Sequence, residues 1–117
     1  MPDTVILHNP RCSKSRSTLK ILDEQGADYE IVEYLKTPPD AARIEQILEL
    51  LALEPRDLMR KGEQEYKDLG LADASLGRDA LIAAMAANPK LIERPIVIRD
   101  GKAVIGRPPE RVLELLS

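Results

Sequence analysis

The chain has 117 residues and a formal net charge of −3, and 44% of its residues are hydrophobic although Trp and Phe are absent. This length fits one compact domain, whose core must be built from aliphatic side chains and Met. The negative charge excludes a general electrostatic attraction to nucleic acid or to an acidic membrane surface, so recognition of an anion must be local.

The first third of the chain predicts a strand, a helix and a second strand. Residues 4–8 are strand-like, residues 14–25 have helical periodicity and stop at Gly26, and residues 29–35 hold the apolar side chains of another strand. This order favours a parallel pair of strands joined by a right-handed crossover.

The middle of the chain predicts helices. Asp40 can cap a helix with a regular apolar face, and Pro55 suits the first turn of a second helix. A third helical stretch spans about residues 78–87. We therefore expect a helical insertion over about residues 36–92.

The last third of the chain predicts a hairpin and a closing helix. Residues 96–98 and 103–105 have the pattern of strands around the tight-turn dipeptide Asp100-Gly101, and residues 110–116 have that of a helix. The whole order predicts an α/β protein with a thioredoxin-like three-layer fold. Its mixed four-stranded sheet would carry the helical insertion between the second and third strands. We expect a single domain over residues 1–117.

The loop between the first strand and the first helix combines positive charge with the only cysteine, Cys12. A helix N-terminus is itself positive and usually attracts acidic or neutral residues. Cations and helix amides favour a thiolate, and the free N–H groups of a first helical turn can cradle an oxyanion. The loop also lies at the C-terminal end of a parallel strand, where α/β sheets bind ligands. We therefore expect a nucleophilic thiolate inside an oxyanion-binding loop that contains Asn9, Arg11, Ser13, Lys14 and Arg16.

A buried, inert thiol is the alternative for Cys12. The spacing around it excludes two other chemistries. A cysteine phosphatase loop needs an arginine where this chain has Thr18, and a dithiol centre needs a second cysteine where it has Ser15. A single cysteine also excludes an intramolecular disulfide and a cysteine-clustered zinc site, and we predict no metal site.

His8 and Ser15 are candidates for support of the thiolate. A protonated His8 could reach the thiol across the loop, and Ser15 could cap the helix or donate a hydrogen bond to the sulfur. The alternative for His8 is a polar strand end satisfied by hydrogen bonds. Arg94 and Arg107 each adjoin a proline at a strand end, where an arginine fork can grip a tetrahedral oxyanion. Composition alone does not distinguish Arg60 from a solvated charge.

The chain contains four ordered motifs: HNPRCSKSRSTL, LMRKGEQEYKDLGL, ERPIVI and IGRPPERVLEL. Over nearly its whole length it resembles the glutaredoxin-coupled arsenate reductases, and it is most similar to short bacterial members without a C-terminal tail. The resemblance implies a thioredoxin-like fold with a helical insertion, in agreement with the element order. It also implies that Cys12 attacks arsenate, and that the oxyanion-binding and transition-state arginines are Arg60, Arg94 and Arg107.

The same resemblance assigns roles to three further residues. It implies that His8 and Ser15 help to lower the thiol pKa, and that Pro95 is a cis proline. One departure stands out in the loop: well-studied members carry Cys-Gly-Thr-Ser, whereas this chain carries Cys-Ser-Lys-Ser. Lys14 therefore adds charge and bulk beside the expected site.

The reaction implied by the resemblance is reduction of arsenate, or of a similar small oxyanion, through a Cys12–arsenate thioester. Because the chain has no second cysteine, an external thiol must resolve this adduct. The resemblance implies glutathione as co-substrate, followed by glutaredoxin, and no bound cofactor. We expect a cytoplasmic protein without a nucleic-acid or membrane partner, since no apolar leader or membrane-length segment is visible.

Two other functions stay open. A sister family with the same fold binds RNA polymerase as a redox or stress regulator, commonly through a two-cysteine switch, and lacks the full set of arginines. A monothiol, glutathione-dependent redox carrier would exchange with glutathione disulfide without requiring arsenate.

Overall fold

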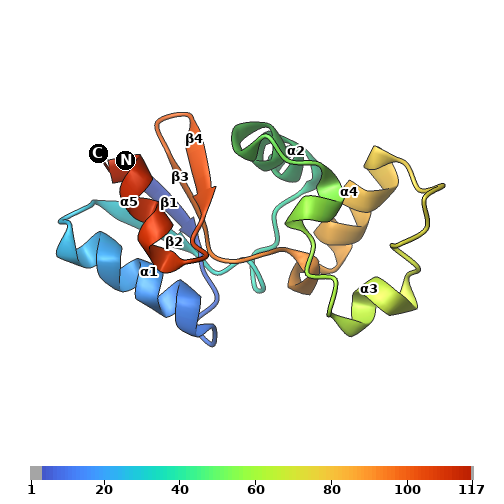
Figure 1. Cartoon of the computed structure of the whole chain (residues 1–117), viewed down its shortest axis with the longest axis horizontal. Coiled ribbons are helices and arrows are strands. Elements are labelled where there is room, and N and C mark those ends of the chain that lie inside the picture. Colours follow the sequence, from blue (N-terminus) through green and yellow to red (C-terminus); the bar gives the residue numbers. More distant parts are fainter. Residues whose placement is uncertain (1–3, 117) are drawn as a thin grey trace. The chain divides into compact units, whose positions relative to one another are not determined.

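The computed structural model describes residues 4–116, which fall into two compact units (Figure 1). The first unit combines the chain up to Thr37 with the chain from Arg94 onward, and the second is the continuous segment Pro38–Glu93. This segment runs between the second and third strands. The grouping of both units into a single domain stays a prediction.

The first unit is built on a mixed four-stranded sheet. β1 pairs parallel with β2 and antiparallel with β3, which in turn pairs antiparallel with β4. The strand order is β2-β1-β3-β4. The expected parallel pair and the mixed sheet of a thioredoxin-like fold are confirmed. The strands are β1 (Thr4–Leu7), β2 (Tyr29–Val32), β3 (Ile96–Arg99) and β4 (Lys102–Ile105).

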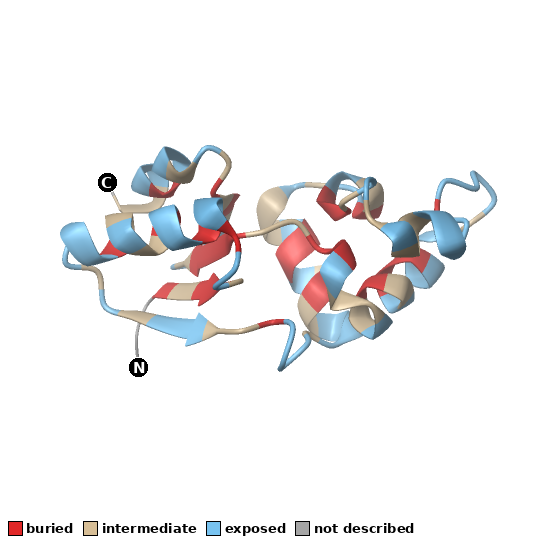
Figure 2. Ribbon diagram, turned by 90° about the horizontal axis from the view of Figure 1, so that it is seen from below, coloured by how far each residue is buried: buried red, intermediate tan, exposed pale blue. Residues whose placement is uncertain are grey.

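Helix α1 (Ser13–Glu24) connects β1 to β2 and has one buried face. Ser15, Thr18 and Leu22 lie on that face, and Figure 2 shows the exposed side of the helix turned away from the strands. The helix stops where Gly26 takes a φ of 70°, a left-handed conformation that glycine adopts at little cost. The predicted helix end is therefore confirmed.

The hairpin and the closing helix complete the first unit. Asp100 and Gly101 have φ values of 49° and 74°, as the tight turn between β3 and β4 requires. The closing segment is a 3-10 turn, η3 (Pro109–Val112), followed by the short helix α5 (Leu113–Leu116), rather than one continuous helix. Helix α1 packs against η3. The buried core of this unit contains Ile6, Leu22, Val97, Val104 and Val112.

The second unit is made of short helical elements. Asp40 caps the first of them, because its side chain accepts a hydrogen bond from the N–H of Arg43 at 2.8 Å. Helices α2 and α4 pack against each other. Within residues 4–116, every helix is too short or too polar to cross a membrane. The elements are α2 (Ala41–Leu51), η1 (Pro55–Leu58), α3 (Gln64–Asp68), α4 (Arg78–Ala87) and η2 (Pro89–Leu91).

Candidate active site

The loop that carries Cys12 begins where β1 ends. Cys12 is the N-cap residue of α1, with an extended backbone (φ −93°, ψ 123°) and a side chain that is only 8% exposed. Its N–H donates to Asn9 O at 3.0 Å, and its C=O accepts from the N–H of Arg16 at 3.0 Å. These bonds turn the chain directly into the helix, so the sulfur lies at the end where the first-turn N–H groups lack helical partners.

The surroundings of Cys12 favour its thiolate. Burial alone would raise the pKa of the thiol. Hydrogen bonding from the backbone of Ser15 and the charge of Arg94 act in the opposite direction, and the backbone of Lys14 and the charge of Arg107 add to them. The net result is a pKa below the ordinary value. A lowered pKa at a helix N-terminus is the property that makes a cysteine nucleophilic.

Arg94 and Arg107 come to this site from the two strands of the hairpin. Ile96 pairs with Ile105, so each arginine lies two residues beyond that pair, at the same end of the sheet. The last residue of β1 also pairs with Ile96, and the Cys12 loop therefore starts at this end as well. The Nε and Nη1 atoms of Arg94 and the Nε atom of Arg107 are buried. Two guanidinium groups beside one sulfur suit the binding of an oxyanion.

Each of these arginines precedes a proline in the cis form. The Arg94–Pro95 bond is cis, as the resemblance implied, and the Arg107–Pro108 bond is cis as well. The N–H of Gly106 donates to Pro95 O at 2.9 Å. This bond holds the two segments together beyond the last paired residues of the hairpin.

Gly106 is a site residue that the sequence did not reveal. A Cβ atom at this position would lie 2.6 Å from Thr18 Oγ1 and 2.8 Å from Pro95 Cγ, which is closer than real Cβ contacts come. Only glycine lets this segment pass so near to α1 and Pro95. The available signal was the glycine directly before Arg107 in the motif IGRPP.

His8 follows β1 and is held by a hydrogen bond, which was one of the two interpretations expected for it. Its Nδ1 atom lies 2.7 Å from Ser15 Oγ, which also accepts from the N–H of Asn9 at 3.1 Å. Burial lowers the pKa of His8, and the charge of Glu33 opposes this only in part. This direction disfavours the protonated form of the ring, and the support of the thiolate by His8 and Ser15 stays a prediction. Ser15 lies inside α1 and is not its cap, since Cys12 holds that position.

Among the remaining residues of the predicted oxyanion-binding loop, hydrogen bonds shape the loop, and most of the side chains are exposed. Asn9 Oδ1 accepts from the N–H of Arg11 at 3.0 Å, and Arg16 Nη1 donates to Pro10 O at 2.9 Å. Ser13 is the first residue of α1. Oxyanion binding by this loop stays a prediction. The exposed residues of the loop are Arg11, Ser13, Lys14 and Arg16.

Arg60 lies in the second unit, among carboxylates. Its N–H donates to Leu91 O at 2.7 Å. Its Nη1 atom is ion-paired with Glu63 Oε1, and its Nε atom lies 3.6 Å from Glu93 Oε1. These partners orient the guanidinium group within its unit, and its expected part in oxyanion binding stays a prediction.

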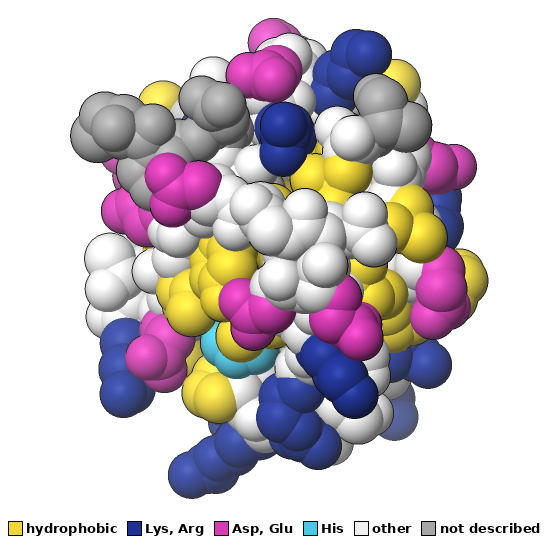
Figure 3. Space-filling view, turned by 90° about the vertical axis from the view of Figure 1, so that its left-hand side faces the viewer, with side chains coloured by type: hydrophobic (Ala, Val, Ile, Leu, Met, Phe, Trp, Pro, Cys, Tyr) yellow, Lys and Arg dark blue, Asp and Glu magenta, His cyan; other side chains and the backbone are white. Residues whose placement is uncertain are grey.

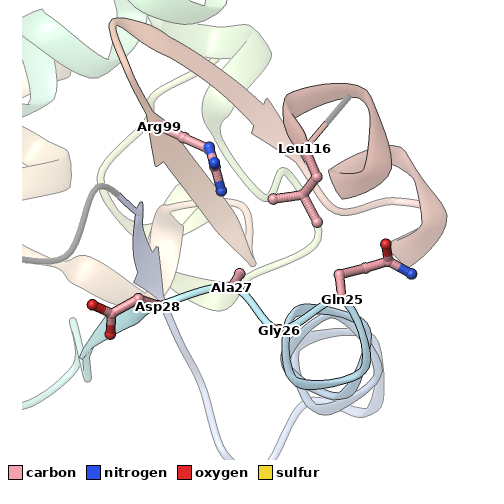
Figure 4. Close-up of a pocket in the computed structure, with 6 residues that line it drawn as sticks. All are labelled: Gln25, Gly26, Ala27, Asp28, Arg99 and Leu116. Atoms are coloured by element: carbon pink, nitrogen blue, oxygen red, sulfur yellow. The ribbon is translucent and has the colours of Figure 1, made fainter.

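A pocket of about 190 Å³ lies at the other end of the sheet. Arg99, which lines it (Figure 4), pairs with Thr4 at the start of β1, whereas the Cys12 loop follows the end of β1. The pocket is thus separate from the Cys12 site. Within residues 4–116, no group of three or more His, Cys, Asp or Glu side chains is arranged to hold a metal ion. The pocket is lined by Gln25, Gly26, Ala27, Asp28, Arg99 and Leu116.

Comparison with known proteins agrees with this architecture. The Escherichia coli protein YfgD is 58% identical over 96% of this chain and 95% of its own length. An arsenate reductase of Neisseria meningitidis is 48% identical over 99% of this chain and 100% of its own. The solved structure of an arsenate reductase from Vibrio cholerae is 50% identical, covers 97% of this chain and 98% of its own, and has a TM-score of 0.95. The model of the ArsC family matches residues 7–115, and this chain therefore belongs to the ArsC family.

Proposed function

We propose that this protein reduces arsenate to arsenite, with Cys12 as the nucleophile. The observation that carries the proposal is the lowered pKa of a buried thiol at the start of α1, beside the charges of Arg94 and Arg107. The names of the relatives from Neisseria meningitidis and Vibrio cholerae support arsenate as the oxyanion.

The first step is attack of the Cys12 thiolate on arsenic. A sulfur–arsenic bond forms, and one arsenate oxygen leaves as water after protonation. Arg94 and Arg107 offset the negative charge that builds on the other oxygens, a form of electrostatic stabilisation that often dominates such reactions. His8 and Ser15 act as positioning residues, because their hydrogen bond holds the helix start that presents its amides to the sulfur. On the family resemblance, Arg60 is a third oxyanion-binding arginine.

The second step needs thiols from outside the chain. Reduction of arsenate takes two electrons, and Cys12 is the only cysteine in the sequence. We assign the two external thiols to glutathione, which attacks the adduct, and to glutaredoxin, which completes the reduction. Arsenate and two thiols then yield arsenite, one disulfide and water, and Cys12 returns as a thiolate. No bound cofactor enters this scheme, and the scheme suits the reducing cytoplasm.

A coupled assay tests the proposal. NADPH oxidation is followed with glutathione, glutathione reductase, glutaredoxin and arsenate present. We expect oxidation that requires the protein and arsenate, and Cys12→Ser or omission of glutathione should abolish it. Exchange with glutathione disulfide, without any arsenate-dependent oxidation, would instead identify a monothiol redox carrier.

A further inference from the structure

Along the sequence, positive charge is concentrated around Cys12. The segment from Thr4 to Leu22 contains no Asp or Glu, although the whole chain has a net charge of −3. Figure 3 shows Lys and Arg side chains along the lower edge of one face, with Asp and Glu side chains above them beside the histidine. The ion pairs found among residues 4–116 involve none of the cations of this segment. These cations, all exposed, are Arg11, Lys14, Arg16 and Lys20.

The exposed cations are distinct from the arginines that act on the sulfur. The side-chain charges that lower the pKa of Cys12 belong to Arg94 and Arg107, which carry buried nitrogen atoms. Lys14 contributes mainly through its backbone, and the main contributing charges do not include Arg11. Arg11 and Lys14 are exposed, and both lie within two positions of Cys12 in the chain.

The other two exposed cations differ from this pair. Arg16 has a structural contact, since its Nη1 atom donates to Pro10 O and ties the helix to the loop. Lys20 lies more than two helical turns after Cys12 along α1. Arg11 and Lys14 therefore remain as the solvent-facing charges that adjoin the reactive cysteine.

Once Cys12 carries arsenic, a second thiol must approach the adduct from solvent. We propose that Arg11 and Lys14 form an entry face that selects a second thiol with net negative charge, namely a thiol that bears free carboxylates. This inference rests on the proposed arsenate reduction and defines the chemistry of its second substrate. It gives the departure at Lys14 a function that a neutral residue could not provide.

The preference for an anionic thiol should be modest, because the charges act through water. Two unit charges about 8 Å apart in water attract weakly, which corresponds to about two- to threefold in rate, and to about sixfold for a dianion. Salt screens such a pair over a Debye length of about 8 Å at physiological ionic strength. The preference should therefore be largest at low salt.

Two disulfide probes of different charge test the entry face without arsenate. The Cys12 thiolate attacks one sulfur of the probe, a mixed disulfide forms, and an aromatic thiolate leaves and absorbs light. The probes are dianionic dithiobis-nitrobenzoate and neutral dithiodipyridine. For each protein, the rate of reaction with the dianionic probe is divided by the rate with the neutral probe. In Arg11→Gln and in Lys14→Gln, this ratio should fall about two- to sixfold at low salt. Lys20→Gln removes the same charge farther from Cys12 and should change this ratio least.

A second assay measures arsenite release and tests whether the entry face acts in the proposed reaction. Glutathione is compared with its diethyl ester, which has the same thiol and no free carboxylates, at a fixed glutaredoxin concentration. The preference for glutathione should shrink in Lys14→Gln. The entry face would be overturned if the probe-rate ratio and the preference for glutathione over its ester were both unchanged in the variants, even if arsenate is reduced. It would also be overturned if the variants raised only the KM for arsenate. Failure of the intact protein to release arsenite with any thiol would overturn the proposed function itself.

Discussion

Groups near Cys12 in the sequence and groups far from it together lower its pKa. The cations next to it in the chain predicted an activated thiol. In the structure, the backbone of Ser15 contributes most to lowering its pKa, followed by the charge of Arg94, the backbone of Lys14 and the charge of Arg107. The activation was predictable because helix starts and cations both stabilise a thiolate. The contribution of the helix amides was predictable as well, but the effect of Arg94 and Arg107 on the thiol was not, because a linear sequence does not show which side chains turn toward the sulfur.

The protonation state of His8 illustrates what a sequence cannot show. Spacing alone left two interpretations open, a protonated ring that supports the thiolate and a polar strand end satisfied by hydrogen bonds. The fold buries that ring to 6% exposure against Ser15, and burial lowers its pKa. Burial depends on packing by residues far away in the chain, so the direction of this pKa shift was not visible in the sequence.

Arg94→Gln should raise the pKa of Cys12, because Arg94 makes the largest side-chain charge contribution to lowering it. The lowered pKa keeps the thiol ionised as the pH falls, until the pH passes that pKa. The variant should lose its thiolate at a higher pH than the parent, and should be alkylated more slowly at neutral pH. Thiolate absorbance as a function of pH measures the shift.

Two further variants serve as controls for Arg94→Gln. Lys102→Gln removes an exposed charge from β4 and should leave the titration midpoint of Cys12 in place. His8→Ala should move the midpoint less than Arg94→Gln, since His8 is not among the groups that shift it. A midpoint that is the same in Arg94→Gln and in the parent would contradict the assigned source of the activation.

At the scale of elements, long periodic segments were predictable and short ones were not. Helix α1, the capped helix α2 and the hairpin strands lie close to their predicted positions. Helix α3 was missed because it has five residues and buries none of them, so it leaves no apolar stripe in the sequence. Strand β2 ends at Val32 rather than at residue 35. Tyr34, just beyond it, is 1% exposed, and its apolar character extended the predicted strand too far.

Gly106→Ala tests how closely α1 and the hairpin must approach each other. The added Cβ atom would lie 2.6 Å from Thr18 Oγ1, which donates a hydrogen bond to Lys14 O, and 2.8 Å from Pro95 Cγ. We expect a loss of about 1–3 kcal/mol in the free energy of unfolding, the usual cost of overpacking. Urea denaturation measures it.

The control for Gly106→Ala is Gly62→Ala. A Cβ atom at Gly62 would have no neighbour within 4 Å. Equal losses of stability in the two variants would point to a general effect of replacing glycine. A stable Gly106→Ala protein with unchanged arsenate turnover would show that the close approach is dispensable.

At the scale of the whole molecule, the sheet is assembled from both ends of the chain. The element order predicted this because strands before and after a helical block must share one sheet to bury their apolar faces. Element order alone did not predict which arginines belong to the site. Arg94 and Arg107 adjoin strands whose register brings them to one end of the sheet. Arg60 lies among short helices, where no periodic pattern separates a binding arginine from a solvated one, and only the family resemblance singled it out.

Arg60→Gln tests whether the second unit contributes to catalysis. If Arg60 binds the oxyanion, its loss should lower arsenate turnover by about 10²–10³, the scale of removing one oxyanion donor. The coupled assay measures this loss.

The matched control for Arg60→Gln is Arg78→Gln. Arg78 lies in the same unit and is ion-paired with Glu45 at 2.6 Å, so its loss also removes a charge and an ion pair. We expect this variant to keep its turnover, and the unfolding midpoints of both variants should be measured alongside. Equal losses of turnover would attribute the effect to the stability of the unit. Full turnover in a folded Arg60→Gln protein would leave Arg94 and Arg107 as the arginines that stabilise the transition state, and would make the ion pairs of Arg60 with Glu63 and Glu93 structural.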